Sequence, residues 1–129
     1  MSRGTLKRIR SACEALGLED GVAERLDSYA LLVVKWGQRV NLVGRPELEF
    51  VREQLILGSL QLLACGELKP ESGRLVDIGS GAGIPAIPLA IVFPGLAVEA
   101  VERRRKRIAF MEHCRRELGL RNLTVSEQD

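Results

Sequence analysis

The sequence predicts an α/β fold in which a helical extension, residues 1–65, precedes a sheet of about three parallel strands, residues 66–129. Two observations lead to this prediction. Strand-like and helix-like segments alternate from Arg74 onward, and three glycines, Gly79, Gly81 and Gly83, separate the first such strand from the first such helix. Alternation of this kind is typical of parallel strands joined by right-handed crossovers. A ligand is then expected at the carboxyl ends of the strands.

In the first half, apolar residues recur at helical spacing. They predict helices at about residues 4–16 and 22–40, and a third that restarts at Arg45-Pro46 and continues to about Cys65. Tyr29 and Trp36 lie on the apolar face of the second helix, so we expect them in the core. The turn-rich segment 66–73 marks the boundary with the second half.

In the second half, the pattern predicts strands at about residues 74–78, 96–101 and 122–126, and helices at about 84–93 and 103–118. His113, the one histidine of the sequence, falls within the last of these helices. It is expected to be an ordinary residue of a helix face rather than a metal ligand or a base.

Composition narrows the class of protein. The chain has 129 residues, of which 46% are hydrophobic, as expected for about one globular domain. A net charge of +2 is too small to indicate a nucleic-acid-binding protein by itself. The three cysteines, Cys13, Cys65 and Cys114, are far apart and have no metal-site spacing, so we expect reduced, buried thiols. With no apolar run of membrane-spanning length, the expectation is a cytoplasmic protein without a metal.

The glycine turn is the predicted ligand site. Glycine allows positive φ and a close approach of the backbone to a ligand, and the helix after the turn presents unpaired amides to an anionic or polar group. Glu102 follows the second strand 19 residues after Gly83, the place of an acid that accepts hydrogen bonds from ribose hydroxyls. The dinucleotide fingerprint is absent, because its sixth position is Ile84. The alternative is a tight turn with no ligand and a solvated Glu102.

The spacing Asp77-x-Gly79-x-Gly81-x-Gly83 resembles motif I of the S-adenosylmethionine-dependent methyltransferases. A narrower resemblance covers about residues 30–125: the run Val76–Ala90 with Pro85 and Pro88, then Glu102-x-x-x-Lys106-Arg107-x-x-Phe110, Glu117-Leu118-Gly119-Leu120-x-Asn122 and, upstream, Trp36-x-x-x-x-Asn41-Leu42. These residues are similar to those of the small-subunit (16S) ribosomal RNA guanine-N7 methyltransferase G family, also called glucose-inhibited division protein B.

The resemblance implies a Rossmann-like class I methyltransferase sheet and S-adenosyl-L-methionine as cofactor. It implies that Gly79, Ser80, Gly81, Gly83 and Ile84 lie against the methionine and ribose of the cofactor. Glu102 would hold the ribose hydroxyls, and Asp77 would orient the turn or meet the cofactor's amino group. The implied partner is 16S rRNA in the 30S subunit or its precursor.

The basic run 103–107 begins the last helix, where positive charge opposes the helix dipole. One interpretation is contact with RNA phosphates, foremost by Lys106 and Arg107, which match the family. The other is a solvated helix face. The sequence leaves both open.

Two departures from the family stand out. Gln54–Ser59 replaces an Arg-His-x-Leu-Asp-Ser signature, and the sequence stops at Asp129, before the family's adenine-contacting Ala-Glu loop and later strands. The expectation is a truncated, catalytically incomplete methyltransferase whose first strand has an open edge. The alternative is a chain whose helical half packs over that edge and which acts as a non-catalytic binding module. No catalytic residue is assigned, since methyl transfer to the N7 lone pair of guanine requires no general base.

Overall fold

The computed structural model describes residues 2–42, 47–64 and 73–128. The first part contains α1 (Ser2–Ala15), α2 (Val22–Gly37), α3 (Leu48–Phe50), the π-helical turn η1 (Val51–Ile56) and α4 (Leu57–Ala64). The second part contains β1 (Gly73–Ile78), α5 (Ala86–Val92), β2 (Leu96–Glu102), α6 (Arg105–Leu118) and β3 (Leu123–Glu127). The predicted helices and strands are confirmed to within about three residues at the ends that are described. Arg45-Pro46, Cys65 and most of the predicted boundary fall outside the described residues.

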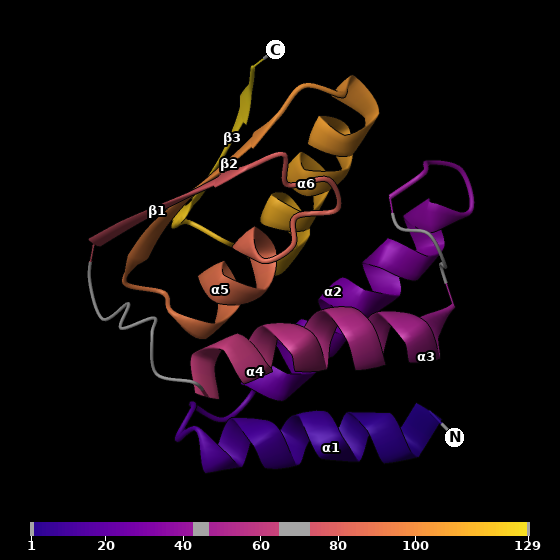
Figure 1. Cartoon of the computed structure of the whole chain (residues 1–129), viewed down its shortest axis with the longest axis vertical. Helices are drawn as coiled ribbons and strands as arrows, with labels where there is room; N and C mark the ends of the chain where they lie inside the picture. Colours follow the sequence, from indigo (N-terminus) through magenta and orange to yellow (C-terminus); the bar gives the residue numbers. More distant parts are fainter. Residues whose placement is uncertain (1, 43–46, 65–72, 129) are drawn as a thin grey trace.

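The three strands form a parallel sheet in the order β1-β2-β3, which confirms the predicted α/β class. Helices α5 and α6 cover one face of this sheet (Figure 1). The side chains of Val76 and Ile78 on the other face are 47% and 79% exposed. Among the described residues, β1 has β2 as its one neighbouring strand and so lies at an edge.

The helical part packs on α5 and α6 through α2, and α1 lies beyond it, at the end of the molecule away from the sheet (Figure 1). The sequence alternative in which the helical half covers the open edge of β1 is therefore wrong in the described residues. The reason is that α2 buries its apolar face, including Leu26, Tyr29 and Val33, against α5 and α6. One continuous hydrophobic core results.

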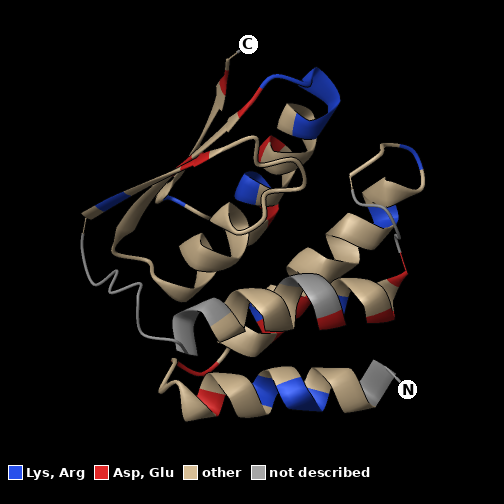
Figure 2. Ribbon diagram, in the orientation of Figure 1, with Lys and Arg blue, Asp and Glu red and all other residues tan. Residues whose placement is uncertain are grey.

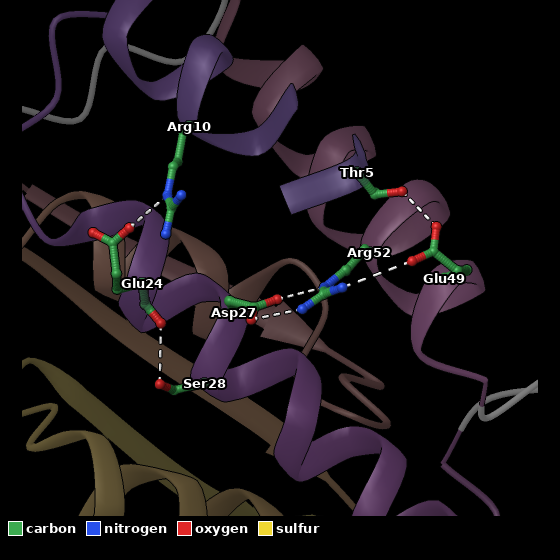
Figure 3. Close-up of polar contacts among 7 residues, drawn as sticks. All are labelled: Thr5, Arg10, Glu24, Asp27, Ser28, Glu49 and Arg52. Carbon is green, nitrogen blue, oxygen red and sulfur yellow. Dashed lines mark hydrogen bonds and ion pairs between the residues drawn. The ribbon is translucent and has the colours of Figure 1, made fainter. Parts of the chain in front are cut away.

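A buried ion pair fixes η1 against α2. Arg52 donates to both carboxylate oxygens of Asp27, at 2.6 and 2.8 Å, and the two side chains are only 6% and 12% exposed (Figure 3). Glu49 adds a longer contact to Arg52, at 3.7 Å, and accepts a hydrogen bond from Thr5 of α1. The side-chain hydrogen bond from Arg52 to Asp27 is the main cause of a raised Arg52 pKa.

The core placements predicted from the sequence are confirmed for Tyr29, which is fully buried. Trp36 is half-buried and meets Phe110 edge-on at 5.6 Å and the ring of His113 at 5.2 Å. Cys13 and Cys114 are free, buried thiols, as expected. No helix in the described ranges is long and apolar enough to cross a membrane.

Candidate cofactor site

The glycine turn begins where β1 ends. Gly79, Gly81 and Gly83 have φ values of 74°, 61° and 90°, so each adopts the left-handed conformation that glycine tolerates best. The amide of Gly79 donates to the carbonyl oxygen of Val101 at 2.8 Å, which ties the turn to the end of β2. The prediction that these glycines serve backbone conformation is confirmed.

Glu102 lies opposite this turn and is 4% exposed. Its Oε1 accepts a hydrogen bond from the Gly81 amide at 2.9 Å, and its Oε2 accepts from the amides of Arg103 and Arg104, each at 2.9 Å. A carboxylate offers about four acceptor positions, so this arrangement leaves Oε1 able to accept once more. The solvated Glu102 of the alternative sequence interpretation is wrong, since β2 delivers this side chain to the glycine turn.

The local environment keeps Glu102 ionised. Burial alone would raise its pKa, but the amides of Arg104, Gly81 and Arg103, together with the charge of Arg107, lower it below the ordinary value of 4.5. A carboxylate that is charged at neutral pH, beside a glycine turn, suits a ligand with hydroxyl donors.

A cavity of about 260 Å³ opens at the carboxyl ends of β1 and β2. Its walls are Ile78 and Gly79 from β1 and the turn, Val101 and Glu102 from β2, and Arg103, Arg104, Arg107 and Gln128. A Cβ placed on Gly79 would have nothing within 4 Å, so the turn leaves open space there. A larger cavity, of about 710 Å³, lies between α1 and α4, but neither a carboxylate nor a glycine turn is among its lining residues.

Three of the predicted site residues shape the turn from below. Ser80, 4% exposed, donates through Oγ to the Asp77 carbonyl oxygen at 2.9 Å, and its own carbonyl accepts from Gly83 and Ile84 at 2.8 and 3.2 Å. Gly83 is packed so closely that a Cβ there would lie 2.5 Å from Cδ1 of Ile87. Neither these residues nor Asp77 line the 260 Å³ cavity.

Asp77 carries the one buried side-chain oxygen or nitrogen without a hydrogen-bond partner in the described part of the chain, its Oδ2. Burial is the main reason that its pKa is raised, and the nearby Ser80 hydroxyl and Ala86 backbone amide act in the opposite direction. The carboxyl group thus lies under the turn with spare acceptor capacity.

The sequence did not reveal two contacts from the helical part to this site. The Tyr29 hydroxyl of α2 donates to the carbonyl oxygen of Ala82, within the turn, at 2.7 Å. Arg107 of α6 donates through Nε to the Asn41 carbonyl oxygen at 3.2 Å, and its Nη1 lies 3.7 Å from the place of a Cβ on Gly81. The one signal in the sequence that could have indicated the first contact is the hydroxyl of Tyr29, because a polar group on an apolar helix face needs a hydrogen-bond partner when it is buried.

Known proteins of similar sequence match most of this chain. The family model described as rRNA small subunit methyltransferase G (GidB) matches residues 22–129. The chain is 36% identical over 125 residues to the ribosomal RNA small subunit methyltransferase G of Ralstonia nicotianae, covering 92% of this chain and 56% of that one. Against the protein of the same name from Alkaliphilus metalliredigens, the identity is 32% over 117 residues, covering 89% and 48%.

Among solved structures, coclaurine N-methyltransferase with N-methylheliamine and SAH is similar in fold, with a TM-score of 0.54 and 14% identity, over all of this chain and 44% of that one. The chain spans about half the length of the curated relatives that it matches. The residues of this chain that match the family model, 22–129, include both the glycine turn and Glu102.

Proposed function

The chain belongs to the rRNA small subunit methyltransferase G family, and from this premise we propose that its glycine turn binds S-adenosylmethionine for methyl transfer to N7 of a guanine in 16S rRNA. The family relationship supports RNA as the substrate class. The proposed binding partner is the 30S subunit or its precursor, which contains this RNA. The proposed location of the protein is therefore the cytoplasm.

The observation that carries the proposal is the position of Glu102. Its ionised carboxylate is fixed by three amides at the mouth of the 260 Å³ cavity, and Oε1 keeps one acceptor position. A ribose hydroxyl is a donor suited to that position. The open space at Gly79 and the positive φ of the turn allow a ligand to lie directly on the backbone.

The other predicted cofactor residues fit supporting roles. Ser80, Gly83 and Ile84 would hold the turn in shape below the ligand, and Gly81 would orient Glu102 through its amide. The free Oδ2 of Asp77 would accept a hydrogen bond from the turn or from the cofactor's amino group.

The cofactor would supply an electrophilic methyl group on a sulfonium. The residues of this chain would bind and orient it, because displacement by the N7 lone pair needs alignment rather than a base. Correct orientation is worth up to roughly 7–11 kcal/mol of a reaction barrier. This requirement is consistent with a site built from backbone turns and one carboxylate.

Lys106 and Arg107 are proposed to contact RNA phosphate. Lys106 is exposed, whereas Arg107 is half-buried between the cofactor cavity and the loop after α2. The cofactor cavity is open to solvent at Ile78, a lining residue that is 79% exposed. We therefore expect this length of chain to bind the cofactor and not to turn over alone, which keeps a non-catalytic binding module as the second candidate.

The test incubates the chain with 30S subunits and tritiated S-adenosylmethionine and measures label in 16S rRNA. Strand scission with borohydride and aniline then reports N7-methylguanine. If labelled N7-methylguanine forms, and is lost in Glu102→Ala, the chain turns over. That result would contradict the expectation that it binds the cofactor without methyl transfer. Label on another atom would contradict the guanine-N7 assignment, and cofactor binding without label is the result that we expect.

A further inference from the structure

A third cavity, of about 340 Å³, lies between the loop after α2 and the start of α6. Five of its seven lining residues are cationic, Arg39, Arg104, Arg105, Lys106 and Arg107, and the other two are uncharged. We call this cavity the basic cleft. Figure 2 shows the cationic start of α6 as a continuous blue segment. Arg39 comes from the helical part, so the fold and not only the sequence run gathers these charges.

The charges in the basic cleft are poorly compensated within the chain. In the described residues, the side chains of Arg39, Arg104 and Lys106 make no hydrogen bond or ion pair. Glu127 lies 3.4 Å from Arg105, and Glu102 is already held by backbone amides. The positive end of the α6 dipole adds to the same field.

Such a cluster opposes folding, because like charges repel and a helix N-terminus favours acids. An anionic ligand with several charges would reverse this cost. The guanidinium fork binds phosphate oxygens in pairs, and a run of phosphates at regular spacing could engage Arg39 and Lys106 together.

The position of the basic cleft narrows the ligand further. Arg104 and Arg107 line both this cleft and the cofactor cavity, so the two spaces adjoin. A polyanion in the basic cleft would pass beside the cofactor. A nucleic-acid strand fits this arrangement, since its phosphates can occupy the cleft while one base reaches the cofactor.

We propose that the basic cleft binds the phosphates of the RNA strand that contains the target nucleotide, and that Arg39 of the helical part is one of the contacts. The proposal rests on the function proposed above, and it adds the helical part to the RNA-binding surface. The contact made by Arg39 is predicted to be sequence-independent, because phosphates carry no base information.

The experiment measures the binding of a fluorescein-labelled single-stranded RNA of roughly 12 nucleotides by fluorescence anisotropy at several salt concentrations. The variant is Arg39→Gln/Lys106→Gln. The matched control is Arg121→Gln, which removes an exposed arginine beyond the far end of α6. Titration with S-adenosylhomocysteine is run on each protein as a separate readout of the cofactor cavity.

Log affinity falls as log salt rises, and loss of two phosphate contacts should make this slope shallower by about 1.4. The affinity near 0.1 M salt should fall by about 25-fold. The melting temperature should stay the same or rise, since repulsion is relieved. An RNA affinity that is unchanged, or that falls equally in Arg121→Gln, would overturn the cleft and the proposed Lys106 contact, and would leave the proposed cofactor binding and methyl transfer untouched. If the unaltered chain binds S-adenosylhomocysteine but no RNA, the cleft and the proposed RNA substrate both fail.

Discussion

The hydroxyl of Tyr29 donates a hydrogen bond to the carbonyl oxygen of Ala82 at 2.7 Å, across 53 residues of sequence, and both residues are buried where α2 meets the glycine turn. Burial is the main cause of the raised pKa of Tyr29, so the hydroxyl keeps its proton and acts as a donor. The helical part therefore fixes a peptide group of the proposed cofactor turn.

Tyr29→Phe should weaken both the fold and cofactor binding. It leaves the Ala82 carbonyl buried without its donor, a cost of about 1–3 kcal/mol in the free energy of unfolding. The turn should also lose definition, so the affinity for S-adenosylhomocysteine should fall. Urea unfolding and calorimetric titration measure the two effects. Ser28→Ala, which removes an exposed hydroxyl bonded within α2, is the control and should change neither. A loss of stability with unaltered affinity for S-adenosylhomocysteine would show that Tyr29 stabilises the core but does not shape the cofactor site.

Gly83→Ala should destabilise the chain more than Gly79→Ala. Both substitutions place an alanine at positive φ, which costs roughly 1–2 kcal/mol. Only at Gly83 does the new Cβ collide, lying 2.5 Å from Cδ1 and 2.7 Å from Cγ1 of the buried Ile87. Overpacking of this kind adds about 1–3 kcal/mol. Thermal or urea unfolding of the two variants gives the comparison, and equal losses would show that Ile87 moves aside freely.

The two acids of the site should give opposite pH dependences of stability. The pKa of Glu102 is lower in the folded chain than its ordinary value of 4.5. Its contribution to the stability of the fold is therefore present above pH 4.5, and is lost as the pH falls through the pKa of the folded chain. The pKa of Asp77 is raised above 3.8, so stability falls as pH rises from 3.8 through the folded value.

Glu102→Gln should therefore lose more stability, relative to the unaltered chain, near pH 7 than near pH 3. Asp77→Asn should gain relative stability over the same rise in pH, because it removes a buried charge. Urea unfolding across this range tests both variants. The same trend in both would contradict the assigned environments.

The buried Asp27–Arg52 pair should contribute far more to stability than the exposed Arg8–Glu53 pair, which also makes two hydrogen bonds. Asp27→Ala removes the carboxylate that accepts two hydrogen bonds from the buried Arg52, and breaking a buried ion pair costs about 3–5 kcal/mol. The comparison is Glu53→Ala, which breaks the exposed two-bond contact with Arg8 and should cost about 0–1 kcal/mol. Chemical denaturation of both variants measures the difference, and similar losses would mean that water reaches the Asp27 site.

The sequence predicted the strand and helix order because each element carries its own signal: helical periodicity before residue 65, and alternation around the glycines after it. It also assigned Glu102 and the glycine turn to one ligand site, since the carboxyl ends of neighbouring parallel strands share one edge of the sheet; the hydrogen bond between Glu102 and the turn was not predicted. The assignments of individual residues to the cofactor stay predictions.

The contacts made across the fold could not be predicted in this way. The bond from Tyr29 to Ala82 and the gathering of Arg39 with the start of α6 depend on how α2 packs, and periodicity does not encode packing partners. The π-helical turn at Val51–Ile56 was also missed, because its apolar spacing resembles that of an ordinary helix. Burial of the Arg52 charge beside Asp27 has no local signature either.

The most direct test of the central claim is calorimetric titration of S-adenosylhomocysteine into the chain and into Glu102→Ala. The account predicts measurable binding to the chain, and binding that is lost or greatly weakened in the variant, because the ribose hydroxyls lose their charged acceptor. Binding of equal strength by both proteins, or by neither, would contradict the claim that the glycine turn and Glu102 form a cofactor site.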